Sequence, residues 1–307
     1  MKTSTLFRFD LEEQLFPDYN SLMEFTIDQS KCTRCGICMK ECPPKTIRRN
    51  NETKEVRIFQ ENCIECSHCG MVCPEAAILV DGEPLPLIPD HKDLTDYEIA
   101  DRLIRTKRSI RKYKSAPLLQ EDLEEILKTG ELTATASNSQ QCEALVLQGG
   151  EVAAASAMMA RELLKLTDLL RNPLFRLLTR KTSIARYTDP RKVNSFSHAL
   201  KMALKGKADP LFFHAPALVI LTYPKKGKRF GRSDCALAGA HMMLSAHARR
   251  LGSCMIGFAE IALRKKSTRK ELGIPADRRI GLIFTLGYAD QNYYRYPKRK
   301  HWDGFFS

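Results

Sequence analysis

Eight of the eleven cysteines lie in two runs that share one spacing, C-x2-C-x2-C-x3-C-P, and start 31 residues apart. The first run holds Cys32, Cys35, Cys38 and Cys42; the second holds Cys63, Cys66, Cys69 and Cys73. Four soft thiolates that converge on one centre are the ligands of a cubane iron–sulfur cluster. The repeat therefore predicts two [4Fe–4S] clusters in a module of two similar halves.

Zinc and disulfide bonds are the alternatives for so many cysteines. Zinc sites usually take well-separated C-x2-C pairs, which two four-cysteine runs ending in proline do not resemble. Disulfides need an oxidising compartment. The charged first residues leave no room for the apolar region of a signal peptide, so we expect a cytoplasmic protein with reduced thiols.

Residues 24–82 resemble the bacterial two-cluster ferredoxins. In that family the fourth cysteine of each run binds the other cluster. The resemblance implies one cluster on Cys32, Cys35, Cys38 and Cys73, and another on Cys63, Cys66, Cys69 and Cys42. His68, between two of these cysteines, is expected at the surface and not as a ligand.

A second group of polar residues follows a predicted helix at residues 93–104. Lys107, Arg108, Ser109 and Arg111 lie within five positions and suit a phosphate monoester. By itself such a run is more often a solvated basic face. Ser137, Asn138 and Gln140 form a polar loop before a short apolar run, and residues 295–300 form a basic segment. An ordinary turn and a basic tail are the alternatives for these two segments.

Taken together and in order, these segments resemble the flavin-dependent nitroreductase family over about residues 92–302. Ala215-Pro216 before an apolar strand, Ile256-Gly257 after a long helix, and Leu286-Gly287-Tyr288 add to the resemblance. Gln141 and Cys142 stand where the family has Pro and Trp, which leaves the shape of the substrate pocket open. Cys142, Cys235 and Cys254 are expected to be buried small residues and not ligands.

The resemblance implies an α+β fold with a mixed sheet between helices, and FMN bound at a homodimer interface. It places the FMN phosphate on Lys107, Arg108, Ser109, Arg111 and Arg299. It places Ser137, Asn138 and Gln140 at the edge of the flavin ring, and backbone groups of Ile256 and Gly257 near its reactive nitrogen. No side chain is expected to act as a nucleophile, because the flavin supplies the chemistry.

The elements that would position these residues divide the chain into a segment at 1–23, the cluster domain at 24–82, a proline-rich linker at 83–91 and an FMN domain at 92–307. Helices are predicted at 118–128, closed by Gly130, and at 233–251, with Ser233 as N-cap and Gly252 as stop. Strands are predicted at 144–147, 217–222 and 280–287.

The stretch 161–207 is strongly basic, with 12 Lys or Arg against 3 Asp or Glu, and is rich in leucine. It predicts a helical lid over the flavin, with a membrane-surface helix as the alternative. A positive site mouth favours an anionic substrate or an acidic redox partner. The formal charge of +13 falls to about +7 with two clusters and FMN bound, and we find no nucleic-acid-binding motif.

Flavin exchanges electrons in pairs or singly, whereas a cubane passes one at a time. The combination predicts an oxidoreductase whose two clusters relay electrons to FMN for reduction of an organic acceptor such as a nitroaromatic or quinone. Ferredoxin and NAD(P)H are both open as donors. The alternatives are an electron-transfer subunit without its own substrate, and a dehalogenase-like or flavin-modifying relative of the same fold.

Overall fold

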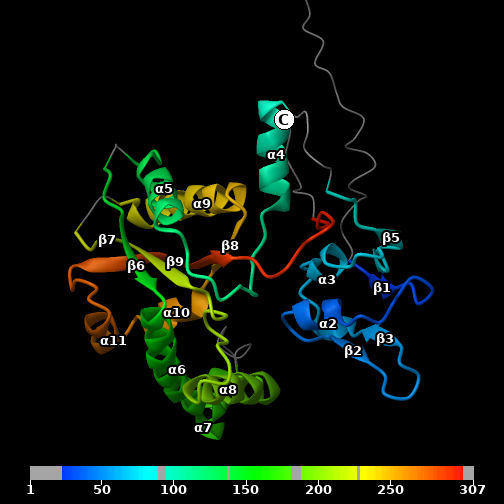
Figure 1. Cartoon of the computed structure of the whole chain (residues 1–307). Helices are drawn as coiled ribbons and strands as arrows, with labels where there is room; N and C mark the ends of the chain where they lie inside the picture. Colours follow the sequence, from blue (N-terminus) through cyan, green and yellow to red (C-terminus); the bar gives the residue numbers. More distant parts are fainter. Residues whose placement is uncertain (1–22, 89–94, 137–138, 181–187, 227–228, 300–307) are drawn as a thin grey trace, which may run out of the picture. The chain divides into compact units, whose positions relative to one another are not determined.

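The structure is a computed structural model and describes residues 23–88, 95–136, 139–180, 188–226 and 229–299. The chain forms two compact units (Figure 1). The first unit comprises Met1–Thr106 and Asn292–Ser307, and the second comprises Lys107–Gln291. The chain therefore leaves the first unit, builds the second, and returns to the first.

The first unit reproduces the sequence repeat in its backbone. Its first half contains β1 (Phe25–Ile27), α2 (Ile37–Glu41) and β2 (Ile47–Arg49). Its second half contains β3 (Val56–Ile58), α3 (His68–Met71) and β4 (Ile78–Val80), each starting 31 residues after its counterpart. β1 pairs with β4 and β2 pairs with β3, both antiparallel, so each sheet takes one strand from each half. The two halves fold as one body.

The predicted linker continues the first unit. β5 (Glu83–Pro84) pairs with β4, Leu87 bridges to Arg295, and the Ile88 N–H donates to the Tyr294 carbonyl at 3.1 Å. The remaining elements of this unit are the 3-10 turn Gln60–Asn62 and α4 (Asp96–Thr106). Residues 89–91 of the predicted linker and nearly all of the predicted segment 1–23 lie outside the described residues.

The second unit is built on a sheet with strand order β6-β7-β9-β8. Its strands are β6 (Glu143–Gln148), β7 (Ala217–Pro224), β8 (Leu251–Met255) and β9 (Arg278–Tyr288). The pairs between these strands are antiparallel, and a parallel bridge between Ser109 and Ser253 makes the sheet mixed. The strands predicted at 144–147, 217–222 and 280–287 are confirmed.

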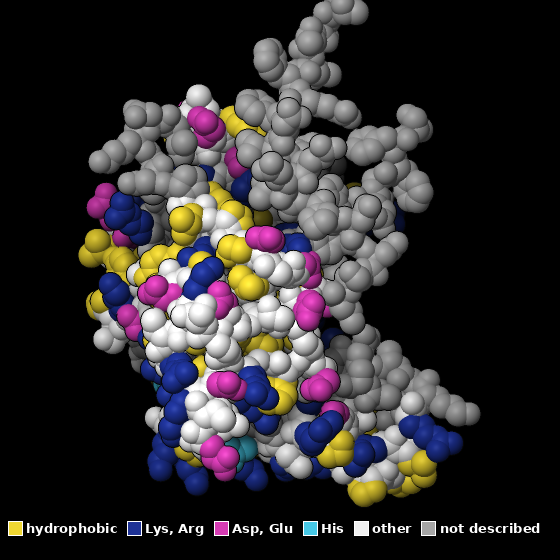
Figure 2. Space-filling model, turned by 90° about the vertical axis from the view of Figure 1, so that its right-hand side faces the viewer, with side chains coloured by type: hydrophobic (Ala, Val, Ile, Leu, Met, Phe, Trp, Pro, Cys, Tyr) yellow, Lys and Arg dark blue, Asp and Glu magenta, His cyan; other side chains and the backbone are white. Residues whose placement is uncertain are grey.

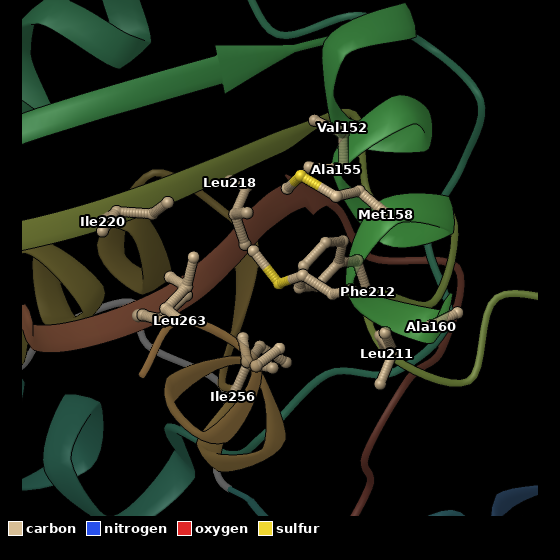
Figure 3. Packing of buried hydrophobic residues seen from close by; sticks show 14 of the residues in the cluster. Val152, Ala155, Met158, Ala160, Leu211, Phe212, Leu218, Ile220, Ile256 and Leu263 are labelled. Carbon is tan, nitrogen blue, oxygen red and sulfur yellow. The ribbon is translucent and has the colours of Figure 1, made fainter. Parts of the chain in front are cut away.

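Alternation along β7 produces two hydrophobic cores, one on each face of the sheet. Leu218 and Ile220 pack on one side, while Ala217, Val219 and Leu221 pack on the other. The first core lies against α6 (Gly150–Arg171), α8 (Pro190–Leu204) and α10 (Gly257–Ala262), and the second against α5 (Gln120–Glu131) and α9 (Gly231–Ala248). Figure 3 shows Phe212 between side chains of α6 and the sheet in the first core. The unit is a three-layer α/β/α sandwich.

Three glycine and capping expectations are wrong. Gly130 lies inside α5 instead of ending the helix, because a Cβ there would lie 1.9 Å from Met242 of α9. Gly252 lies in β8, where a Cβ would lie 2.7 Å from Ile110. Ser233 lies within α9, whose N-cap is Phe230. The two glycines allow close packing between elements, which local sequence does not reveal.

The basic stretch 161–207 contributes to the core layer. Leu163 on α6 and Leu200 on α8 are buried in the first core, and the Lys and Arg side chains of the stretch that the structure describes are exposed or partly exposed. Between these helices, α7 (Pro173–Thr179) exposes Leu174, Leu177 and Leu178. Residues 181–187 lie outside the described residues, and α11 (Lys266–Glu271) completes the unit. Within the described part of the chain, no helix is long and apolar enough to cross a membrane.

Candidate functional site

Four thiols of the first unit surround one cavity. Cys32, Cys35, Cys38 and Cys73 line it, three from the first cysteine run and one from the end of the second. Arg34 and Gly36 adopt positive φ angles of 59° and 76°, which turn the loop around the cavity. α2 begins directly after this turn and carries Cys38 on its first turn. Cys35 is exposed, so the cavity approaches solvent at that thiol.

The other four thiols surround a second cavity in the same manner. Cys63, Cys66 and Cys69 line it together with Cys42 from the end of the first run. Glu65 and Ser67, at the positions equivalent to Arg34 and Gly36, also have positive φ angles, 52° and 60°. The grouping of thiols is thus the crossed one that the resemblance implied. That the thiols bind iron–sulfur clusters stays a prediction for each residue.

The crossing cysteines receive equivalent backbone hydrogen bonds. The Thr46 N–H donates to Cys42 Sγ at 3.4 Å, and the Ala77 N–H donates to Cys73 Sγ at 3.3 Å. Hydrogen bonds to ligand sulfurs stabilise the more negative state of a cluster and raise its reduction potential. The repeat therefore preserves this feature of the thiol environment as well as the ligand spacing.

The thiols are costly to ionise in the absence of a metal. Burial raises the pKa of Cys38 to about 11, with smaller contributions from Cys73, Cys32 and Cys35 beside it. Burial also raises the pKa of Cys69 well above its usual value, and Cys66 and Cys42 add to the shift. Groups of mutually repelling thiolates are stable when they share a cationic centre. The donor type, number and convergence fit [4Fe–4S] clusters.

His68 and the C-terminal segment correct the expectation of a surface histidine. His68 is buried, at 6% exposure, and its ring meets Tyr293 edge-on with centroids 5.6 Å apart. The Tyr293 hydroxyl donates to Glu41, and Arg295, at 4% exposure, donates to the Pro74 carbonyl beside Cys73 at 3.0 Å. The segment that follows the second unit thus covers both cysteine loops.

The predicted phosphate residues of the second unit gather around Cys254 of β8. Ser109 forms the parallel bridge to Ser253, and the Ile110 N–H donates to the Ser253 carbonyl at 2.9 Å. Burial raises the pKa of the Cys254 thiol, while Arg111, Ser109 and Lys107 beside it act in the opposite direction. The chain segment after α4 is therefore fixed along the edge of β8.

This cluster of cations fits a phosphate. Burial lowers the pKa of Lys107, and neighbouring Arg108 adds to the effect. No ion pair joins Lys107 or Arg111 to a carboxylate among the residues that the structure describes. Arg111 Nη1 and Ser253 Oγ are buried without a hydrogen-bond partner there. Buried donors without partners are unfavourable, so a dianion beside them would satisfy the site.

The predicted ring-edge loop is held by a residue that the sequence analysis missed. Asp234, 2% exposed in the first turn of α9, accepts from the Ala136 N–H at 3.1 Å and from Ser139 Oγ and Gln141 Nε2, both at 3.3 Å. A single carboxylate at the start of an apolar helix is the sequence signal that could have found it. Ser137 and Asn138 lie outside the described residues. Gln140 is exposed, with a positive φ of 42°, and donates its N–H to Thr135.

The start of β9 fixes the other end of this loop. Arg278 is buried and donates to the Gln141 carbonyl at 2.9 Å and to Glu143 at 2.7 Å.

Of the three remaining cysteines, Cys235 and Cys254 are buried as expected, and Cys142 is partly buried. Cys235 donates to Cys142, with the two sulfurs 3.3 Å apart.

Ile256 and Gly257 differ in what their backbones can offer. The Ile256 N–H donates to the Ile283 carbonyl at 2.9 Å and is used within the sheet. Gly257 begins α10, where an N–H has no partner within the helix. A Cβ built on Gly257 would meet nothing within 4 Å. Of these two backbone N–H groups, the Gly257 N–H is therefore the candidate for a contact with a ligand.

Arg299 is exposed and belongs to the first unit, whereas the other predicted FMN residues within the described part of the chain belong to the second. Its neighbour Lys298 is paired with Asp81 of the first unit. Arg299 and the phosphate cluster thus belong to different units, and the role of Arg299 stays a prediction.

Comparison with known proteins gives the class of each unit. The nitroreductase family profile matches residues 104–288, and a 4Fe–4S dicluster domain profile matches residues 24–74. The chain belongs to the nitroreductase family. It is a flavin-dependent oxidoreductase with an N-terminal ferredoxin-type iron–sulfur domain, and the predicted fusion and α+β fold class are confirmed.

Individual relatives are distant. A protein of Archaeoglobus fulgidus, provisionally named NADH dehydrogenase/NAD(P)H nitroreductase, is 27% identical over 190 residues, covering 61% of this chain and 83% of the relative. An FMN-bound nitroreductase of Desulfitobacterium hafniense is 18% identical with a TM-score of 0.49, over 67% of this chain and 97% of that one. An FMN-bound nitroreductase of Bacteroides fragilis is 18% identical with a TM-score of 0.48, over 68% and 97%.

Proposed function

We propose that the protein uses two [4Fe–4S] clusters as an internal relay to FMN and reduces an organic acceptor such as a nitroaromatic or quinone. The observation that carries this proposal is the pair of four-thiol cavities in a chain that also builds a cation cluster suited to the FMN phosphate. When bound, the cofactors convert between one-electron and two-electron transfer. The protein supplies binding, orientation and charge.

The residues divide this work between the two units. The eight cysteines of the first unit would hold the clusters. Lys107, Arg108, Ser109 and Arg111 would hold the FMN phosphate, and the loop anchored by Asp234 would lie at the ring edge. Nitroreductases commonly act as dimers with NAD(P)H as donor, and the named relative fits that donor. We infer a cytoplasmic homodimer whose electrons enter instead through the clusters.

The donor decides between the relay and the simpler NAD(P)H route. Anaerobic protein is mixed with NADH, NADPH or reduced ferredoxin, and flavin absorbance is followed with and without a nitroaromatic. We expect rapid flavin reduction by ferredoxin and turnover of the nitroaromatic. Rapid reduction by NAD(P)H with no response to ferredoxin would reject the relay. Flavin reduction without turnover of any organic acceptor would favour the electron-transfer subunit.

A further inference from the structure

The first unit carries an open basic groove beside the first thiol cavity. Lys40, Lys45, Arg48 and Arg49 line it, the groove has a volume of about 690 Å³, and no acidic side chain is part of its lining. Figure 2 shows Lys and Arg side chains interspersed with Asp and Glu over one face of the molecule. In the groove, the four cations form a local positive field without an acidic side chain in the lining.

No carboxylate among the described residues neutralises these charges. Lys45 Nζ donates to the Lys40 carbonyl at 2.8 Å, and Arg49 donates to the Arg34 carbonyl. The Arg48 guanidinium lies 5.4 Å from the centre of the Phe59 ring, which is 43% exposed. None of the four cations forms an ion pair with a carboxylate of the described residues. These contacts hold the side chains of Lys45, Arg48 and Arg49 in place and leave the charges available to a partner.

The groove and the first thiol cavity share two residues. Cys35 and Gly36 line both, and Cys35 is the exposed member of its thiol set. A cluster bound by that set would have its most accessible edge at the floor of the groove.

We propose that the basic groove is the docking surface of an acidic one-electron carrier protein, which delivers electrons to the cluster on Cys32, Cys35, Cys38 and Cys73. The proposal rests on the proposed function and specifies its donor. Each encounter oxidises one carrier by one electron and reduces the cluster by one electron, so two carriers supply the pair needed by a two-electron acceptor. The groove is open and lined by four cations, whereas small-molecule pockets are mostly enclosed and apolar. Exposed Phe59 beside Arg48 adds the apolar contact that protein interfaces contain.

The test reverses two groove charges. The variant Lys45→Glu/Arg48→Glu is compared with wild type and with Arg191→Glu/Lys192→Glu, which makes the same charge change on exposed residues of the second unit. That control also tests the basic stretch 161–207 as the docking surface. The probe is an acidic plant-type [2Fe–2S] ferredoxin, reduced beforehand, and cluster absorbance is followed by anaerobic stopped flow. Photoreduced deazaflavin serves as a small reductant, and iron analysis checks cluster content.

We expect the groove variant to lose roughly ten-fold or more in second-order rate with ferredoxin at low salt, and to lose the steep decrease with ionic strength. The control variant should stay within about two-fold of wild type. Reduction by deazaflavin and iron content should be equal in all three proteins.

Three results would overturn the proposal that the groove is a docking surface. The first is an unchanged rate of reduction by ferredoxin in the groove variant, and the second is an equal loss of rate in the control variant. The third is inhibition of the wild-type reaction by ATP or inorganic phosphate that clearly exceeds inhibition by a chloride salt of the same ionic strength. That result would indicate a small-anion site. Failure of the proposed function looks different. In that case wild-type clusters would accept no electrons from ferredoxin, or reduced clusters would not reduce the flavin.

Discussion

Cys42 and Cys73 each end one cysteine run but line the cavity of the other. The pairing of β1 with β4 and β2 with β3 produces this crossing, because it brings the end of each half beside the start of the other. Each cluster would therefore depend on both halves of the repeat.

Double replacements test the crossing. Cys38→Ala/Cys73→Ala removes two ligands of one predicted cluster, so about four iron atoms should remain per chain. Cys38→Ala/Cys69→Ala removes one ligand from each cluster and should leave little iron. Iron and sulfide are measured on anaerobically reconstituted protein, with Cys142→Ala as the control that keeps about eight. Equal iron in the two double variants would contradict the crossed assignment.

Arg111 and Lys112 are adjacent cations in different environments. Arg111 has a buried Nη1 without a partner among the described residues, whereas Lys112 is exposed and pairs with Asp290 at 3.3 Å. Arg111→Gln should weaken FMN binding about 10- to 100-fold, since a hydrogen bond to a charged group contributes about 1.5–3 kcal/mol. Lys112→Gln should bind FMN like wild type. Flavin fluorescence quenching measures both affinities, and equal values would remove Arg111 from the phosphate site.

Spacing was enough to single out the eight cysteines, because the thiols within one run need only local turns to converge. The crossed grouping came instead from the resemblance to two-cluster ferredoxins, because the fourth thiol of each set lies in the other run. Spacing did not predict that His68 is buried or that Asp234 holds the loop before β6. The Tyr293 that covers His68, and the loop that Asp234 holds, are distant in sequence, so their contacts depend on the tertiary fold.

At the scale of elements, the helix α9 packs so closely on the sheet that glycine is required beneath it. A Cβ at Gly281 of β9 would lie 2.4 Å from the Cβ of Cys235. This is contact with a rigid part of the helix, so relief requires the helix to move away from the sheet.

Gly281→Ala should therefore destabilise the second unit. Overpacking of this kind costs about 1–3 kcal/mol, which corresponds to a decrease in Tm of roughly 3–10 °C. Gly150→Ala is the matched control, because Gly150 begins α6 and a Cβ there meets nothing within 4 Å. Thermal release of FMN reports on this unit. A Gly281→Ala protein with the Tm of wild type would show that the two elements are less tightly packed than described.

The strands β6, β7 and β9 and the helices α5 and α9 could be predicted because their apolar patterns are strong and local. The helix α6 and the strand β8 were not predicted. The ends of the helices could not be predicted. Gly130 and Gly252 have the sequence appearance of stop signals, yet each occupies a position where another element approaches within van der Waals distance. Glycine is found both at the ends of helices and where two elements pack closely. Which of these applies depends on the element that packs against it, and local sequence does not show that element.

At the scale of the whole molecule, the first unit is discontinuous in sequence, since Asn292–Ser307 belongs to it. Tyr293 contacts His68, whereas the neighbouring Tyr294 exposes 43% of its surface. The tail therefore shields the loop that carries Cys66 and Cys69.

Tyr293→Ala should make the clusters more sensitive to oxygen. Removing the ring opens the second thiol loop to solvent, and we expect cluster absorbance in air to decay several-fold faster than in wild type. Tyr294→Ala keeps the backbone hydrogen bonds of the segment and should decay at the wild-type rate. Equal decay of the two variants would show that the tail does not protect the cluster.

The return of the chain to its first unit also sets an order of events during synthesis. The cysteine loops leave the ribosome early, but Arg295, which binds the Pro74 carbonyl, follows 221 residues later. At about 5–20 residues per second, the loops wait roughly 10–45 s for the segment that covers them. During that interval the thiols are open to the machinery that inserts iron and sulfide. Translation of the second unit would thus act as a delay, after which Tyr293 and Arg295 close over the cysteine loops.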